Sequence, residues 1–205
     1  MSGATRNTTA LYLPGVERHH QPGIYHDLIA AAQDRNQEYS KIWDLFAFQQ
    51  DFTIHLARFT HGVLRTPASI SPGLRELIAA YTSYQNDCAF CTQAHAAAAS
   101  ELLGDETLVW AALRDVDHAP LDEKTRELLR FAGKVTRTLP AVNADDIEAL
   151  RGAGWDDEAI YYAITTCALF NFYNRWITAT GVPVMSVDAH RAQGKALAAR
   201  GYIRD

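Results

Sequence analysis

Apolar residues recur at helical spacing along most of this 205-residue chain. Between residues 41 and 64, for example, Phe52, Leu56 and Phe59 fall on one face of a 3.6-residue helix. No segment alternates apolar and polar residues over a length typical of a strand. The chain is therefore expected to be all-α, with at least six helices and no sheet. The periodicity predicts helices over residues 24–39, 41–64, 106–113, 123–138, 144–151, 156–181 and 184–199, besides two around the cysteine motif described below.

Proline, glycine and polar residues divide the chain into regions. Residues 1–23 mix proline and glycine with polar residues, which predicts an irregular N-terminal arm. Residues 24–205 would then form a single compact helical domain. Pro72 suits a first helical turn and Gly104 suits a helix end, so residues 72–104 are expected to hold two helices joined by a break.

Composition excludes several classes of function. Hydrophobic residues make up 48% of the chain, as in soluble globular proteins, and the net charge of −5 offers no basic surface for nucleic acid. No apolar run approaches the roughly 18 residues of a membrane span, and the first residues lack the apolar core of a signal peptide. We therefore expect a cytoplasmic protein without nucleic-acid or membrane partners, whose thiols are kept reduced.

Two of the three cysteines lie in one segment, residues 75–104, with the sequence RELIAAYTSYQNDCAFCTQAHAAAASELLG. Cys88, Cys91 and His95 are spaced i, i+3 and i+7, so a helix would bring their side chains to one face within two turns. Glu76 lies on the preceding predicted helix. The segment is thus expected to form a helix hairpin around which the domain is built, with these four side chains sharing one pocket.

The cysteine pair is expected at a helix N-terminus. Asn86 and Asp87 supply the turn and capping residues that would begin the second helix near Cys88. The partial positive charge of a helix start stabilises a thiolate, and Cys-x-x-Cys pairs commonly have thiol pKa values in the range of roughly 3.5–7.5. Two cysteines three residues apart can also close a disulfide reversibly.

Other roles for the pair fit the sequence less well. A structural zinc site takes four ligands, whereas Cys88, Cys91 and His95 give three and no second Cys-x-x-Cys follows. Haem attachment needs a histidine at position 92, which is a threonine, and thioredoxin-like chemistry needs a βαβ pattern. No metal or other cofactor is therefore expected. Two buried and inert cysteines stay open as an alternative.

A few other residues interrupt the predicted apolar segment 156–181. Cys167 has no partner at motif spacing and is expected to be a buried small hydrophobe. Asn171, Asn174 and Arg175 are polar groups that would need hydrogen-bond partners if buried. We expect them to cap or bridge helices.

The four motif residues follow the spacing E-x11-C-x2-C-x3-H, which resembles the signature of the alkylhydroperoxidase D-like group within the carboxymuconolactone decarboxylase superfamily. The similarity extends through IWDLFAF at residues 42–48 and FNFYNRWITATGV at residues 170–182 towards the branch called peroxidase-related proteins, and so covers most of the chain. One position departs from the pattern. Where the best-known peroxidase of the family carries a histidine just before the second cysteine, this chain has Phe90, so one polar helper is missing.

The resemblance implies a thiol-dependent peroxidase that reduces hydrogen peroxide or organic hydroperoxides and is itself reduced by a dithiol or a thioredoxin-like protein. In the implied mechanism one thiolate attacks the peroxide, becomes a sulfenic acid and is resolved by the other cysteine to a disulfide. His95 and Glu76 would form the proton relay, because a carboxylate orients an imidazole and raises its basicity.

The sequence also predicts which cysteine attacks. Cys88 is nearer the helix start, but that charge is worth only about 0.3–1 kcal/mol at an exposed site. Cys91 lies one turn before His95, and a positioned base contributes about 10²–10⁴-fold. Cys91 is therefore the predicted attacking thiol, as in the family it resembles, and Cys88 the resolving one.

Two other functions stay open. A lactone decarboxylase or another proton-transfer enzyme could use His95 and Glu76 without a redox step, although the cysteine pair argues against it. Alternatively, the protein could be a redox-sensing oligomer in which the disulfide changes packing without turnover. The predicted helices 41–64 and 156–181 carry more apolar surface than a small monomer readily buries, which predicts a homo-oligomer. The resemblance implies a dimer, trimer or hexamer.

Overall fold

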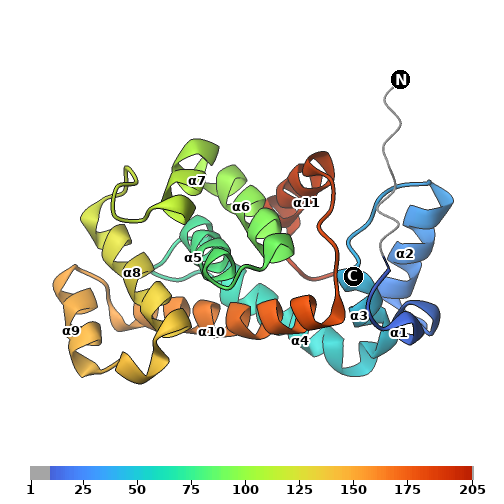
Figure 1. Ribbon diagram of the computed structural model, residues 1–205, viewed down its shortest axis with the longest axis horizontal. Coiled ribbons are helices and arrows are strands. Elements are labelled where there is room, and N and C mark those ends of the chain that lie inside the picture. The colour runs from blue at the N-terminus through green and yellow to red at the C-terminus, as the bar shows by residue number, and fades with distance from the viewer. Residues whose placement is uncertain (1–9, 205) are drawn as a thin grey trace.

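Helices account for all the regular secondary structure of residues 10–204, which are the residues described by this computed structural model (Figure 1). The predicted all-α class is thus confirmed, with eleven α-helices and one short 3-10 helix in the described part of the chain. The elements are α1 (Pro14–Arg18), α2 (Ile24–Asp34), α3 (Ile42–Phe48), α4 (Gln50–Arg65), α5 (Pro72–Gln85), α6 (Ala89–Leu103), α7 (Glu106–Arg114), α8 (Glu123–Arg137), η1 (Leu139–Ala141), α9 (Ala144–Gly152), α10 (Asp157–Thr180) and α11 (Val187–Arg200).

Helix α5 lies at the centre of the molecule. It packs against α4, α6, α7, α8 and α10, and every residue from 73 to 83 is buried. A helix that is enclosed on all sides is normally apolar all round. Helix α5 nevertheless buries Arg75 and Glu76, and buried charges need partners. This requirement shapes the site described below.

Local chemistry explains where the central helices begin and end. The Ser71 hydroxyl accepts a hydrogen bond from the Leu74 amide at 3.2 Å, and Pro72 occupies the first turn of α5 as predicted. Gly104 ends α6 in the left-handed region, at φ 74°, as its position in the sequence predicts. The hairpin predicted over residues 72–104 therefore exists, with α5 and α6 as its two arms.

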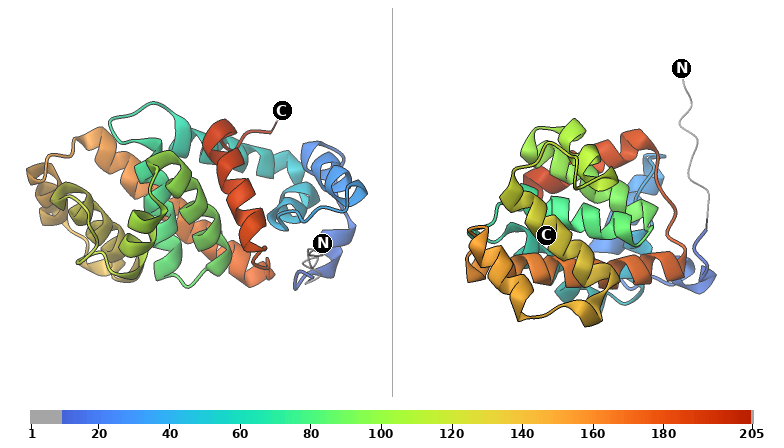
Figure 2. Two further views of the ribbon diagram at one scale, coloured as in Figure 1. Left: turned by 90° about the horizontal axis from the view of Figure 1, so that it is seen from above. Right: turned by 60° about the vertical axis from the view of Figure 1, so that its left-hand side comes forward.

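Helix α11 runs beside α6 and separates it from the N-terminal helices, as the left view of Figure 2 shows. The approach is close at Gly194, where a Cβ would lie 2.6 Å from the Ala97 side chain and 2.7 Å from its backbone. Only glycine fits such a contact without a shift of one helix. Because α11 is held there, the chain that follows it is brought back to the middle of the molecule.

The predicted continuous helix over residues 41–64 is wrong in one respect. The backbone leaves helical geometry at Gln49, with φ −138° and ψ 60°, and separates α3 from α4. The buried Thr53 hydroxyl donates to the Phe46 carbonyl at 2.8 Å and to the Gln49 carbonyl at 3.0 Å. A side chain thus satisfies backbone groups at the break, which apolar periodicity cannot reveal.

Two other predicted helices are shorter than expected. Helix α2 ends at Asp34 because Asn36 turns the chain with a left-handed backbone, at φ 53°. Helix α11 begins at Val187 because the Ser186 hydroxyl accepts a hydrogen bond from the Ala189 amide. In both cases a local turn or cap overrides the apolar pattern.

The predicted irregular arm contains one short helix. Residues 1–9 lie outside the described part of the chain, but α1 forms where Pro14 opens a helical turn. Leu11 and Val16 are buried in the same apolar cluster as Phe46. The described part of this arm therefore packs against the other helices, and the division into an arm and a domain stays a prediction.

The apolar stripe of α4 does not face the core throughout. Phe52 and Phe59 are 61% and 52% exposed, and Tyr161 and Phe172 on α10 are 65% and 48% exposed. The surplus apolar surface predicted for these two helices is thus present, while the homo-oligomer itself stays a prediction. Although α10 spans 24 residues, neither it nor any other helix within residues 10–204 is long and apolar enough to cross a membrane.

Candidate active site

The structure brings the four predicted site residues together at the α5–α6 hairpin. Glu76 lies in α5, Cys88 caps α6, and Cys91 and His95 follow on the first two turns of α6. All four are buried, with exposed fractions between 0% for Glu76 and 8% for His95. Asp87 precedes them in a left-handed conformation, at φ 53°. Asp87 therefore forms the turn, and Cys88 itself, not Asn86 or Asp87 as expected, occupies the N-cap position.

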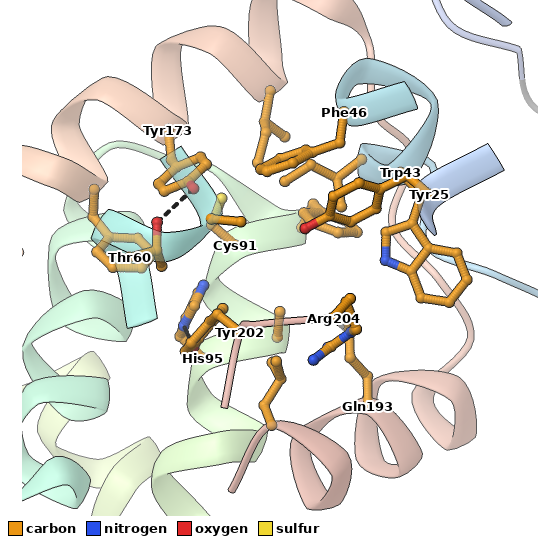
Figure 3. Close-up of a pocket in the computed structure, with 17 residues that line it drawn as sticks. Tyr25, Trp43, Phe46, Thr60, Cys91, His95, Tyr173, Gln193, Tyr202 and Arg204 are labelled. Carbon is orange, nitrogen blue, oxygen red and sulfur yellow. Dashed lines mark hydrogen bonds between the residues drawn. The ribbon is translucent and has the colours of Figure 1, made fainter. Parts of the chain in front are cut away.

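Glu76 fixes the orientation of His95. The imidazole Nδ1 lies 2.7 Å from the Glu76 Oε2, and a carboxylate can only accept, so Nδ1 carries the proton. This leaves the lone pair of a neutral imidazole on Nε2. Figure 3 shows that edge of the ring turned towards the Cys91 sulfur. The pair can therefore take a proton from a group placed between Cys91 and His95.

Two residues that the sequence analysis did not identify complete this network. The Arg65 Nη2 and the Tyr202 hydroxyl each donate to Glu76 Oε1 at 2.6 Å. The Tyr202 hydroxyl also lies 3.2 Å from the His95 Nδ1, and the Arg65 guanidinium stacks 5.1 Å from the Tyr202 ring centre. The carboxylate of Glu76 thus has three partners from three separate parts of the chain.

The network keeps Glu76 ionised. Burial alone would raise the pKa of Glu76, but the hydrogen bond of His95, the charge of Arg65 and the hydrogen bond of Tyr202 outweigh burial and lower the pKa. Burial raises the pKa of Tyr202, so its hydroxyl stays protonated and available as a donor. A buried carboxylate without such partners would be strongly destabilising.

The two cysteines form a reduced pair at the start of α6. Both thiols are free, and they approach to about 3.4 Å. The Cys91 thiol can donate a hydrogen bond to a Cys88 thiolate, and this proximity lowers the pKa of Cys88 to about 6 despite its burial. Burial and the neighbouring negative charge raise the pKa of the Cys91 thiol. In the resting pair the negative charge therefore lies on Cys88 and the shared proton on Cys91.

Asparagines from α10 hold the hairpin turn next to the cysteines. The Asn86 Nδ2 donates to Asn174 Oδ1 at 2.9 Å and to Asn171 Oδ1 at 3.1 Å, and the Asn174 Nδ2 donates to Ser83 Oγ at 2.9 Å. The predicted bridging role of Asn171 and Asn174 is confirmed. Arg175, by contrast, is exposed and bonds to Asn171 on its own helix.

Cys167 lies apart from the pair, as predicted. Its side chain is buried in a second apolar cluster, which contains Leu128 and Leu129, and its thiol donates to the Ala132 carbonyl at 3.4 Å. Burial raises the pKa of this thiol. Cys167 is thus a packing residue and provides an internal reference for the reactivity of the pair.

A pocket of about 80 Å³ opens onto Cys91 and His95 (Figure 3). Most of the residues that line it are aromatic or aliphatic. Phe90, which stands where the best-known peroxidase of the family has a histidine, is one of these apolar residues. Cys88 is not among the lining residues. The residues that line the pocket are Tyr25, Ile42, Trp43, Phe46, Ala57, Thr60, Phe90, Cys91, Ala94, His95, Phe170, Tyr173, Ile177, Gln193, Leu197, Tyr202 and Arg204.

The site has the chemistry of a thiol and acid–base centre. Across residues 10–204 no group of three or more histidine, cysteine, aspartate or glutamate side chains is arranged to hold a metal ion. What the arrangement offers is a thiol pair that shares one proton, an oriented imidazole and a mostly apolar pocket in front of Cys91. Such a set can transfer protons and can form a disulfide.

The thiolate of the pair should titrate near pH 6. Because folding lowers the pKa of Cys88 from 9.0 to about 6, the thiolate and its contribution to stability are fully present above pH 9 and are lost as the pH falls through about 6. We expect thiolate absorbance in the ultraviolet to rise around pH 6 in the wild type. It should shift to higher pH in Cys91→Ala and disappear from this range in Cys88→Ser. A wild-type midpoint near 9 would contradict this charge distribution.

The similarities to known proteins agree with this site. Residues 50–117 match the model of the carboxymuconolactone decarboxylase family, and this range contains all four motif residues. The alkylhydroperoxidase-like resemblance seen in the motif is thereby confirmed. None of the curated proteins matches the sequence.

Three solved structures share the fold over most of the chain. An uncharacterized peroxidase-related protein from Silicibacter sp. TM1040 is 27% identical, with a TM-score of 0.74, over 93% of this chain and 97% of that one. A second, described as an alkylhydroperoxidase AhpD core from Ralstonia eutropha JMP134, is 24% identical, with a TM-score of 0.72, over 85% and 91%. The debrominase Bmp8, in complex with 2,3,4-tribromopyrrole, is 17% identical, with a TM-score of 0.62, over 95% of each chain. The last two likenesses concern the fold alone.

Proposed function

We propose that this chain is a thiol-dependent peroxidase, because residues 50–117 match the model of the carboxymuconolactone decarboxylase family and Cys91 lines the pocket together with an oriented imidazole. Its substrates are hydrogen peroxide or organic hydroperoxides, and a dithiol or thioredoxin-like protein reduces it again. The observation that carries the proposal is that Cys91 and His95 line one pocket while Cys88 lies directly behind Cys91. Attack and resolution can then occur at a single position.

The first half of the reaction oxidises Cys91. His95 takes the thiol proton on Nε2, and the Cys91 thiolate attacks the terminal oxygen of the hydroperoxide. The O–O bond breaks, Cys91 becomes a sulfenic acid, and the alkoxide that leaves takes the proton from His95 to give an alcohol. The Glu76 carboxylate stabilises the imidazolium that forms in between, at 2.7 Å from Nδ1.

The second half uses the charge on Cys88. The Cys88 thiolate attacks the sulfur of the Cys91 sulfenic acid, an S–S bond forms, and the hydroxide that leaves takes a proton from solvent to become water. Because the resting pair already holds its negative charge on Cys88, the resolving thiol needs no further deprotonation. An external dithiol supplies the two electrons that open the disulfide and restores both thiols.

Access explains why Cys91 attacks although Cys88 is the more acidic thiol. Both sulfurs are buried, but only Cys91 lines the pocket through which a peroxide reaches the pair. A thiolate that substrate cannot reach does not react, whatever its pKa. His95 accepts the proton that Cys91 must lose, and the Cys88 sulfur stays a thiolate for the resolving step.

The fold by itself does not decide the reaction. The debrominase with the same fold acts on a different class of compound, and the dyad of Glu76 and His95 could also transfer protons to a lactone. The cysteine pair distinguishes these possibilities. A proton-transfer enzyme would stay active after both thiols are alkylated, whereas a thiol peroxidase would lose all activity.

A steady-state assay tests the proposal. Wild-type protein with dithiothreitol should consume hydrogen peroxide and cumene hydroperoxide catalytically, and the double variant Cys88→Ser, Cys91→Ser should show only the background rate. Cys167→Ser is the matched control, because it also removes a buried thiol but lies outside the site, and it should retain turnover. Equal turnover in the wild type and the double variant would contradict the proposed function.

A further inference from the structure

The pocket in front of Cys91 is larger than hydrogen peroxide requires. One water needs roughly 10–15 Å³ of such volume, whereas the pocket has about 80 Å³. Aromatic and aliphatic side chains from α2, α3, α6 and α10 form most of its walls. The space therefore suits a small organic molecule with an apolar body.

One wall of this pocket is polar and comes from the C-terminal part of the chain. Gln193 on α11 and Arg204 beyond it line the pocket on the side opposite Phe46 and Tyr173, as Figure 3 shows. Arg204 is partly buried, and within residues 10–204 its Nη1 donates only to the backbone carbonyls of Gly201 and Ile203, at 2.9 and 3.1 Å. Its remaining guanidinium donors can therefore serve a ligand.

The charge of Arg204 is not neutralised by any carboxylate within residues 10–204. Among the described residues, the ionisable groups that act on it are Arg200, which repels it, and the hydroxyls of Tyr25 and Tyr202, whose raised pKa values keep them neutral. Burial lowers the pKa of Arg204, which reflects the cost of keeping a cation in this position. Arg65 differs, because it pairs with Glu76 at 2.6 Å. An anion that entered the pocket would compensate the charge of Arg204.

Gln193 adds a second unsatisfied group to the same wall. Its Oε1 is buried and makes no hydrogen bond to any described residue. Rotation of the amide about its last bond would present the NH₂ group to the pocket instead. Gln193 can then donate a hydrogen bond to the same anion as Arg204.

We propose that the pocket takes organic hydroperoxides that carry a carboxylate, with the acid bound by Arg204 and Gln193 and the hydroperoxide at Cys91. A single guanidinium matches a monoanionic carboxylate, which it can bind through two parallel hydrogen bonds. The aromatic walls accommodate the apolar body between the two ends. This inference rests on the proposed peroxidase function and names its substrate class.

A matched pair of substrates tests the proposal. Cumene hydroperoxide and its para-carboxylate differ only by the acid, so the ratio of their kcat/KM values isolates the contribution of the carboxylate. The wild type should favour the acid by about tenfold or more, the gain expected of a charge-assisted hydrogen bond. In Arg204→Gln this ratio should fall by about the same factor, and in the control Arg58→Gln, which removes an exposed arginine outside the pocket, it should not change. A ratio that is equal in the wild type and Arg204→Gln overturns the proposal.

A binding measurement separates this proposal from the peroxidase function. The affinity of the reduced protein for 4-isopropylbenzoate, which cannot be turned over, is measured by calorimetry for the wild type and both arginine variants. If no hydroperoxide is consumed but Arg204→Gln weakens binding about tenfold or more, the acid site holds and the peroxidase function fails. If the wild type does not bind the acid, or binds it no better than Arg204→Gln, the acid site is wrong whether or not hydroperoxides are reduced.

Discussion

Replacing Cys88 by serine should make a sulfenic acid accumulate at Cys91, and replacing Cys91 by serine should abolish sulfenic acid formation at the pair. In Cys88→Ser the attacking thiol still lines the pocket beside His95, but the resolving thiol is gone. In Cys91→Ser the remaining thiol lies behind the pocket wall. A dimedone-type trap followed by mass spectrometry measures the difference after one equivalent of hydroperoxide.

This experiment tests whether access from the pocket or a low thiol pKa decides which cysteine attacks the peroxide. Cys88 has the lower thiol pKa, whereas a positioned base such as His95 raises the reaction rate of the neighbouring thiol by about 10²–10⁴-fold. Cys167 supplies the internal control, because its thiol is buried elsewhere and should stay unlabelled in both variants. Labelling of Cys88 in Cys91→Ser, with Cys91 unlabelled in Cys88→Ser, would reverse the two roles.

Glu76→Gln should both lower the stability of the protein and reduce its peroxidase turnover. The variant leaves the Arg65 cation without its carboxylate in a buried network, which typically costs about 3–5 kcal/mol of the free energy of unfolding. It also removes the charge that stabilises the His95 imidazolium, so turnover should fall by about 10²-fold or more. Urea denaturation and the steady-state peroxidase assay measure the two effects.

The stability effect of Glu76→Gln should depend on pH in a defined direction. Folding lowers the pKa of Glu76 below 4.5, so the stabilisation by the carboxylate is fully present above that value and is lost as the pH falls through the lower, folded pKa. Tyr202→Phe is the control, since it removes one hydrogen bond to Glu76 and keeps the charge pair, and it should cost about 1–3 kcal/mol. If Glu76→Gln lowers the free energy of unfolding by less than about 1 kcal/mol at neutral pH, the hydrogen-bond network does not need the negative charge of Glu76.

The centre of the site could be predicted because its geometry is local. The spacing of Cys88, Cys91 and His95 fixes their positions on two turns of one helix, and the turn before Cys88 fixes where that helix starts. Glu76 also follows, because a short hairpin returns the chain beside the preceding helix. The burial of these residues, by contrast, depends on the helices that pack around α5.

The rest of the site comes from distant parts of the chain and has no local pattern. Tyr202 reaches Glu76 across 126 positions, and Arg204 enters the pocket after the last helix. Both follow helix α11, which packs closely against α6 at Gly194. Arg65 is partly foreseeable, because a carboxylate predicted inside a protein requires a cation nearby. Nothing in the sequence indicates which cation that is.

The prediction of one continuous helix over residues 41–64 failed for a physical reason. The break at Gln49 is supported by a Thr53 hydroxyl that replaces helical hydrogen bonds, and side-chain hydrogen bonds leave no trace in apolar periodicity. The face that carries Phe52 and Phe59 satisfies the helical pattern yet is exposed. Periodicity identifies an apolar face, but it does not say whether that face meets the core of the same chain.

The most direct test of the account is a thiol count before and after one equivalent of hydroperoxide in the absence of reductant. The chain has three cysteines, and all three are free in the structure. The account predicts that one equivalent lowers the count from three thiols to one, with a Cys88–Cys91 disulfide found by peptide mapping and Cys167 still reduced. Three remaining thiols, or a disulfide that includes Cys167, would contradict the central claim that this pair reduces peroxides.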